Sequence, residues 1–115
     1  MEAGRASGRP VLVYFSAPWC YLCRKMQRLV FPDPAVSAMM GREFILAAVD
    51  VSRQERVKEL YAITEVPTTI FLDAQGEPVL RLRGYLDRRS LTRAMRYVFQ
   101  GQYRRLDWDA YCRRN

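Results

Sequence analysis

The sequence contains no histidine among its 115 residues. This absence excludes catalysis by a Ser–His or Cys–His pair and removes the most common zinc ligand in proteins. No apolar run approaches the roughly 18 residues of a membrane span, so we expect a soluble chain without a membrane-spanning segment. The first residues also lack the apolar core of a signal peptide, which indicates either a cytoplasmic protein or a mature segment whose leader has been removed.

Acidic residues are few relative to basic ones, with 12 Asp and Glu against 19 Lys and Arg, and the formal net charge is +7. Nucleic-acid binding would need basic side chains on one face, interleaved with aromatic side chains that stack on bases. The arginines are instead scattered along the chain, with extra weight only at Arg104, Arg105, Arg113 and Arg114. We therefore expect a solvated, arginine-rich surface and no nucleic-acid partner.

Cysteine is scarce as well, and the count of three is odd. An odd count does not fit the paired framework of a small secreted protein stapled by disulfides. Cys20 and Cys23 have the Cys-x-x-Cys spacing of redox pairs, whereas Cys112 lies near the C-terminus. Three hypotheses follow: a thiol–disulfide exchange pair, a soft-metal site for copper(I) or zinc, and a redox-inert interaction domain. The metal hypothesis lacks a histidine to complete a tetrahedral ligand set.

The segment around Cys20 predicts a strand, a short connection and a helix. Residues 11–15 form an apolar run rich in β-branched and aromatic side chains, and helical spacing of apolar residues begins at Leu22. At a helix N-terminus, unpaired N–H groups and the positive end of the helix dipole lower a pKa that is about 8.5 in free cysteine. Cys20 is therefore the expected nucleophile, and Cys23, one turn further in, is the expected resolving thiol.

The pattern predicts an α/β domain over residues 10–99, after a flexible lead-in over residues 1–9. The expected elements are a strand over 11–16, a helix from 20 to 31, a helix over 34–41, a strand over 44–51, a helix over 53–62, strands over 68–72 and 78–83, and a closing helix that ends near 99. Parallel strands joined by a helical crossover and followed by an antiparallel hairpin give a mixed four-stranded sheet with helices on both faces.

Capping residues set several expected helix boundaries. Asp33 followed by proline predicts the start of the second helix, and Gly41 predicts its end. Asp87 or Ser90 is expected to cap the closing helix. The helix over 53–62 is expected to bury Val57, Leu60 and Tyr61.

Two strands are expected in different environments. The run over residues 44–51 is continuously apolar, which predicts a central strand covered on both faces. Arg81 and Arg83 alternate with apolar residues in the strand over 78–83, which predicts an edge strand with one face in water.

The segment over residues 100–115 is expected to add a short C-terminal helix. Tyr103, Leu106 and Ala110 have the spacing of one helical face, and Asp107 or Asp109 could cap a turn. We expect Cys112 to be structural, with a regulatory or intermolecular thiol as the alternative.

Three motifs occur in a consistent order along the predicted elements. Trp19-Cys20-Tyr21-Leu22-Cys23 follows the first strand, Val66-Pro67-Thr68 precedes the third, and Gly84 follows the fourth. With these motifs, the sequence resembles the thioredoxin-like family over about residues 10–99. Residues 23–26, 30–36 and 84–86 are most similar to thioredoxin-related proteins of the bacterial cell envelope. Members of that group keep partner proteins reduced, for example in cytochrome c maturation or sulfur oxidation.

This resemblance implies a thiol–disulfide oxidoreductase that acts on protein disulfides, more as a reductase than as an oxidant. It implies no cofactor and no bound metal, an upstream protein reductant that resets the pair, and a monomer. It also implies a periplasmic location if a leader has been removed.

The resemblance also implies roles for residues outside the cysteine pair. Pro67 would follow a cis peptide bond and lie against the cysteines, with a trans turn proline as the alternative. Val66 would offer its backbone N–H and C=O to an extended substrate chain. Trp19 would shape the rim of the site, with a core tryptophan as the alternative. The implied substrate-binding residues are Trp19, Tyr21, Leu22, Val66, Pro67 and Gly84.

The sequence departs from thioredoxins proper at several places. Tyr14 and Ala48 occupy the places of a buried Asp and a Lys that help to move protons, so proton transfer must use water, Cys23 itself or another group. Tyr21-Leu22 replaces the usual Gly-Pro between the cysteines, so no redox potential is transferred from the family. Residues 1–9 leave no room for the N-terminal strand and helix, so we expect a fold trimmed on that side.

Overall fold

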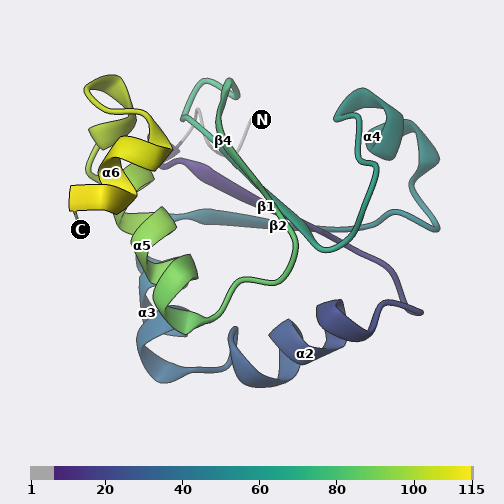
Figure 1. Cartoon of the computed structure of the whole chain (residues 1–115). Coiled ribbons are helices and arrows are strands. Elements are labelled where there is room, and N and C mark those ends of the chain that lie inside the picture. The colour runs from purple at the N-terminus through teal and green to yellow at the C-terminus, as the bar shows by residue number, and fades with distance from the viewer. Residues whose placement is uncertain (1–6, 115) are drawn as a thin grey trace.

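The sheet consists of four strands in the order β2-β1-β3-β4 (Figure 1). In the computed structural model, which describes residues 7–114, these are β1 (Val11–Ser16), β2 (Ile45–Asp50), β3 (Thr68–Leu72) and β4 (Pro78–Arg83). β1 pairs with β2 in parallel and with β3 antiparallel, and β3 pairs antiparallel with β4. The mixed sheet is therefore the expected one, with β4 at an edge as the alternation of its arginines predicted.

The helices lie on both faces of this sheet (Figure 1). They are α2 (Tyr21–Leu29), α3 (Pro34–Glu43), α4 (Glu55–Leu60), α5 (Arg88–Phe99), the 3-10 turn η1 (Gln102–Arg104) and α6 (Trp108–Arg114). Successive residues of a strand point to opposite faces. The Tyr14 hydroxyl reaches the carbonyl of Cys23 in α2, whereas the neighbouring Phe15 ring packs against Tyr61, which follows α4. α2 and α4 therefore cover opposite faces, and the predicted fold class is confirmed.

Two of the predicted helix caps form as expected. The Asp33 carboxylate accepts the backbone N–H of Val36, and proline occupies the first position of α3. Asp87, rather than Ser90, caps α5, since its carboxylate accepts the N–H of Ser90 at 2.8 Å. α3 does not end at Gly41 but continues to Glu43, because the helix ladder runs on until Phe44 donates to the Met40 carbonyl and buries its ring.

The prediction that residues 44–51 form a central strand is wrong. β2 lies at an edge of the sheet, and the Leu46 side chain there is 52% exposed. In the described part of the chain, no strand pairs with the outer edge of β2. A run of apolar residues shows only which side chains a strand carries. The strand is buried on both faces only where other elements cover both of its faces.

The helix predicted over 53–62 is shorter than expected, and of its predicted inward residues Val57 and Tyr61 pack against the core whereas Leu60 does not. α4 spans six residues, and Leu60 is 78% exposed instead of buried. The backbone turns at Ala62, which has a positive φ of 52°, and Tyr61 takes the inward place with its ring centroid 5.6 Å from that of Phe15. The expectation for Leu60 is therefore wrong: it is the last residue of α4, and after the turn Ile63 is buried in the core instead.

The C-terminal segment folds back onto α5 as two short pieces, η1 and α6 (Figure 1). Tyr103 lies in η1 and Leu106 follows it, so the expected single face with Ala110 is not formed. Asp107 caps α6 by accepting the N–H of Ala110 at 2.8 Å. The segment is held by aromatic contacts with Tyr97 of α5, whose hydroxyl donates to the Leu106 carbonyl at 2.6 Å. The rings around Tyr97 are those of Tyr103, Trp108 and Tyr111.

Candidate active site

The local structure at Cys20 follows from the turn between β1 and α2. The N–H of Cys20 donates to the Ala17 carbonyl at 3.1 Å, which closes the turn after the strand. Cys20 is then the N-cap of α2, and its Sγ accepts the backbone N–H of Cys23 at 3.1 Å. The sulfur thus takes the place of the capping oxygen that Ser or Asp supplies elsewhere. The expected position at a helix N-terminus is confirmed.

Cys20 and Cys23 form a disulfide, with their Cα atoms 5.3 Å apart. The two residues differ in access, since Cys23 is fully buried and Cys20 is 6% exposed. Cys20 is therefore the member of the pair that an incoming group can meet, and Cys23 can be reached only from Cys20. This asymmetry matches the expected division between nucleophile and resolving thiol.

Two basic side chains near the start of α2 have structural contacts beside the pair. Arg24 donates to the Pro18 carbonyl at 2.6 Å and braces the turn that leads to Cys20. The Lys25 ammonium lies 4.7 Å from the centroid of the Tyr85 ring, which links α2 to the segment after β4. Both cations lie near the N-cap, where they add positive charge to the helix dipole.

The side chains around Cys20 form an exposed apolar rim. Trp19 is 71% exposed, Tyr21 60% and Leu22 40%. Trp19 is therefore not a core residue, which removes the alternative that the sequence left open. Scattered apolar exposure is ordinary on protein surfaces, but here three large exposed side chains flank one buried sulfur.

The second and third motifs meet where β3 begins and β4 ends. The Val66–Pro67 peptide bond is cis, as the resemblance implies, and Pro67 is buried while Val66 is half-buried. The Pro67 carbonyl accepts the N–H of Gly84 at 2.7 Å. Gly84 has a φ of 94°, a backbone conformation that glycine adopts without steric cost. Val66 also lines a small hollow of about 80 Å³ together with Trp19 of the first motif.

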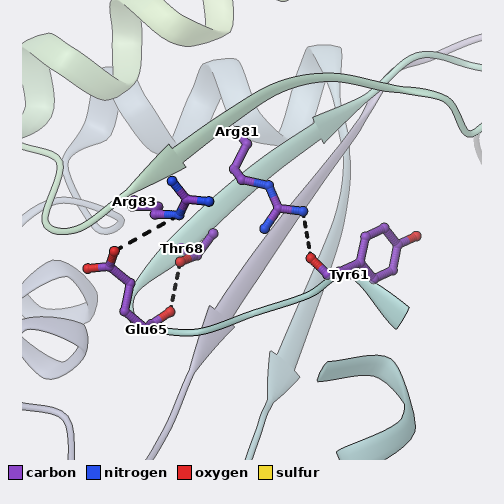
Figure 2. Close-up of polar contacts among 5 residues, drawn as sticks. All are labelled: Tyr61, Glu65, Thr68, Arg81 and Arg83. Atoms are coloured by element: carbon purple, nitrogen blue, oxygen red, sulfur yellow. Dashed lines mark hydrogen bonds and ion pairs between the residues drawn. The ribbon is translucent and has the colours of Figure 1, made fainter. Parts of the chain in front are cut away.

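The loop that carries Val66 is tied to the edge strand β4 by two arginines (Figure 2). Arg81 donates to the Tyr61 carbonyl at 2.5 Å, and Arg83 lies 4.0 Å from the Glu65 carboxylate. The Thr68 hydroxyl of β3 donates to the backbone carbonyl of Glu65 at 2.8 Å. The sequence pattern identified both arginines only as signs of an edge strand. Their contacts join residues about twenty positions apart in the sequence, so no local pattern predicts them.

Tyr14 of β1 contacts the helix that carries the cysteine pair and is almost fully buried. Its hydroxyl donates to the Cys23 carbonyl at 3.1 Å. Burial raises the pKa of this hydroxyl above its ordinary value of 10.0, and a hydrogen bond with the Gln27 side chain partly opposes the shift. Tyr14 and Ala48, which replace the Asp and Lys of thioredoxins proper, line one pocket of about 290 Å³.

Neither a metal site nor a membrane segment is found in residues 7–114. Cys112 is a free, half-buried thiol on α6. Over this range no group of three Cys, His, Asp or Glu side chains is arranged to hold a metal ion. None of the helices there has the length and apolar content needed to cross a bilayer.

The chain is similar to known proteins in family, in sequence and in structure. Residues 1–99 match the family described as a thioredoxin-like domain. The chain is 36% identical over 92 residues to the thiol:disulfide interchange protein DsbD of Vibrio vulnificus, an alignment that covers 75% of this chain and 15% of that protein. It is 34% identical over 88 residues to DsbD of Salmonella typhi, covering 72% of this chain and 16% of that protein. The chain thus spans about one sixth of the length of these relatives.

Two solved structures extend the comparison to the fold. A thioredoxin from Thermus thermophilus superposes with a TM-score of 0.76 at 30% identity, covering 84% of this chain and 78% of that one. The oxidised C-terminal domain of DsbD from Neisseria meningitidis superposes with a TM-score of 0.65 at 19% identity, covering 86% of this chain and 90% of that domain. The second match shows a shared fold.

Proposed function

Because this chain belongs to the family of thioredoxin-like domains, we propose that it is a thiol–disulfide oxidoreductase that exchanges electrons with disulfides of partner proteins through Cys20 and Cys23. One observation carries the proposal: the Cys20 sulfur is the N-cap acceptor of α2 and lies within disulfide reach of a fully buried second cysteine. A helix N-terminus stabilises a thiolate, which is the attacking form in exchange.

The reaction proceeds in two displacements. The Cys20 thiolate attacks one sulfur of the partner disulfide, and the other partner sulfur leaves as a thiolate with the electron pair. A mixed disulfide now joins Cys20 to the partner. Cys23 loses its proton and attacks the Cys20 sulfur, which forms the Cys20–Cys23 disulfide and releases the second partner thiolate. The partner gains two electrons and the cysteine pair loses two.

The direction we propose is reduction of the partner. Support comes from the similarity to envelope thioredoxin-related proteins and from relatives named for disulfide interchange. The cycle then needs an upstream protein reductant that opens the Cys20–Cys23 disulfide again, and it needs no cofactor. We place the protein in the periplasm on the same grounds, and we expect it to act as a monomer.

The partner chain binds beside the cysteine pair in this proposal. Trp19, Tyr21 and Leu22 supply the exposed apolar surface around the nucleophile. Val66 offers its backbone to an extended strand of the partner, as in other strand-addition complexes. Pro67 and Gly84 support this segment through their mutual hydrogen bond.

The experiment that tests this function is trapping of the mixed disulfide. Reduced Cys23→Ser protein is incubated with insulin or a disulfide-linked peptide, and a covalent adduct through Cys20 that dithiothreitol releases is expected. The matched control Cys20→Ser/Cys23→Ser should form none, while Cys23→Ser/Cys112→Ser should form as much adduct as Cys23→Ser. Absence of an adduct with any protein or peptide disulfide would overturn the proposed activity.

A further inference from the structure

The described residues place one hydroxyl directly against the backbone of the resolving cysteine. Tyr14 is 4% exposed, and its hydroxyl donates to the Cys23 carbonyl at 3.1 Å in the first turn of α2. Its ring packs edge-on against Phe31, with the centroids 4.7 Å apart, and this packing restricts where the hydroxyl can lie. The same hydroxyl has a hydrogen bond with the Gln27 side chain, one turn further along α2. A buried hydroxyl held in this way constrains the turn that carries Cys23.

No charged side chain is among the described residues that line the pocket beside this hydroxyl. The pocket beside it is lined by Ser16, Gln27, Phe31, Met40, Leu46 and Ala48, none of which ionises near neutral pH. Since burial also raises the pKa of Tyr14, the hydroxyl keeps its proton throughout the range in which thiols titrate. Tyr14 can therefore donate to the Cys23 carbonyl over that whole range of pH.

We propose that Tyr14 is a positioning residue for the resolving step, because its hydroxyl fixes the first turn of α2 and so holds the Cys23 sulfur against Cys20 while a partner is attached. This inference rests on the proposed function and adds to it. In the mixed disulfide, the Cys23 thiolate must displace the partner from the Cys20 sulfur, and the rate of such an intramolecular step depends on alignment of the reacting atoms. Attack by Cys20 on the partner does not need the Cys23 sulfur to be aligned.

The two steps can be separated with a peptide disulfide that carries a different fluorophore on each half. Attack by Cys20 releases the first half, and resolution by Cys23 releases the second. For Tyr14→Phe we expect the first release to stay within twofold of the natural protein. The second release should slow roughly three- to tenfold, the factor that loss of one net hydrogen bond gives.

Tyr97→Phe is the matched control. Tyr97 is also buried, its pKa is also raised, chiefly by burial, and its hydroxyl also donates to a backbone carbonyl, that of Leu106. It lies in α5 and contacts the C-terminal segment rather than α2 or the Cys20–Cys23 pair. Tyr97→Phe should leave both releases unchanged, although it removes the same chemical group.

The pH dependence of the second release distinguishes positioning from proton transfer. Positioning predicts that Tyr14→Phe lowers the rate equally from pH 6 to pH 9 and leaves the midpoint of the profile in place. An unchanged second release, an equal slowing in Tyr97→Phe, or a shifted midpoint would each overturn the role of Tyr14. If the natural protein released neither half, the proposed function itself would fail, and this role with it.

Discussion

At the scale of single residues, the reactive sulfur also has a structural task. Cys20 is both the expected nucleophile and the N-cap of α2, with its Sγ accepting the Cys23 N–H. A serine hydroxyl can accept the same hydrogen bond, whereas alanine cannot. Chemistry and capping can therefore be separated by choosing the substitution.

Both Cys20→Ser and Cys20→Ala should abolish exchange, and they should differ in stability. In the reduced proteins, we expect Cys20→Ser to keep the free energy of unfolding within about 0.5 kcal/mol, and Cys20→Ala to lose about 1 kcal/mol because the helix loses its cap. Urea denaturation under reducing conditions measures both. Equal stabilities of the two variants would show that the sulfur does not cap the helix.

The sequence identified the two cysteines from their spacing and their place before a helical pattern. It could not decide whether Trp19 lies in the core or on the rim, because a tryptophan beside a strand fits both environments. For Tyr14, the sequence showed only that it replaces the buried Asp of thioredoxins proper. Its contact with Cys23 joins residues nine apart across a strand and a helix, and no local periodicity encodes that distance.

At the scale of elements, a carboxylate cap makes one helix sensitive to acid. The Asp87 carboxylate accepts hydrogen bonds from Ser90, and these are the main reason that its pKa is lowered below the ordinary 3.8. A lowered folded-state pKa gives stabilisation that is present above pH 3.8 and is lost as the pH falls through the folded value.

Asp87→Ala should therefore lower the free energy of unfolding by about 1 kcal/mol at pH 7. The difference from the natural protein should shrink as the pH is lowered below 3.8, because protonation weakens the natural cap. Asp87→Asn is the control, since it caps the helix without a charge. Urea titrations at pH 7 and at a pH below 3.8 should show the shrinking difference for Asp87→Ala, and the cap of Asp87→Asn should not weaken between the two pH values. A difference for Asp87→Ala that does not change with pH would contradict the assignment of the cap.

The loop before β3 depends on the edge strand beside it (Figure 2). Arg81 makes a direct hydrogen bond with the Tyr61 carbonyl, whereas the pair of Arg83 and Glu65 is 4.0 Å long and both side chains are more than half exposed. Exposed ion pairs of this kind contribute little. The loop should therefore rely on Arg81 more than on Arg83.

We expect Arg81→Met to raise the amide hydrogen-exchange rates of residues 62–66 several-fold, because the loop loses its hydrogen bond to β4. Arg83→Met removes a similar side chain from the same strand and should leave those rates nearly unchanged. Mass spectrometry of peptides after hydrogen exchange measures these rates in both variants. Equal exchange in the two variants would mean that the Arg81 contact does not restrain the loop.

At the scale of the whole molecule, alternating strand and helix patterns were enough to predict the mixed sheet and its helices on both faces. The edge position of β2 was missed, because burial of a strand depends on which elements lie outside it and the run over residues 44–51 carries no sign of that. The C-terminal segment was placed as helical but with the wrong face, because its packing is set by Tyr97 on another helix. Local chemistry thus predicts elements better than it predicts their neighbours.

The fold brings the end of β1, the start of α2 and the Val66–Pro67 segment to one end of the sheet, and exchange depends on the sulfur at that helix start. The most direct measurement is the pH dependence of alkylation of Cys20 by iodoacetamide in reduced Cys23→Ser/Cys112→Ser protein. The folded protein should show a midpoint clearly below the value of about 8.5 for free cysteine, and the same variant in denaturant should return to that value. A folded-state midpoint at or above 8.5 would contradict a thiolate stabilised by the start of α2.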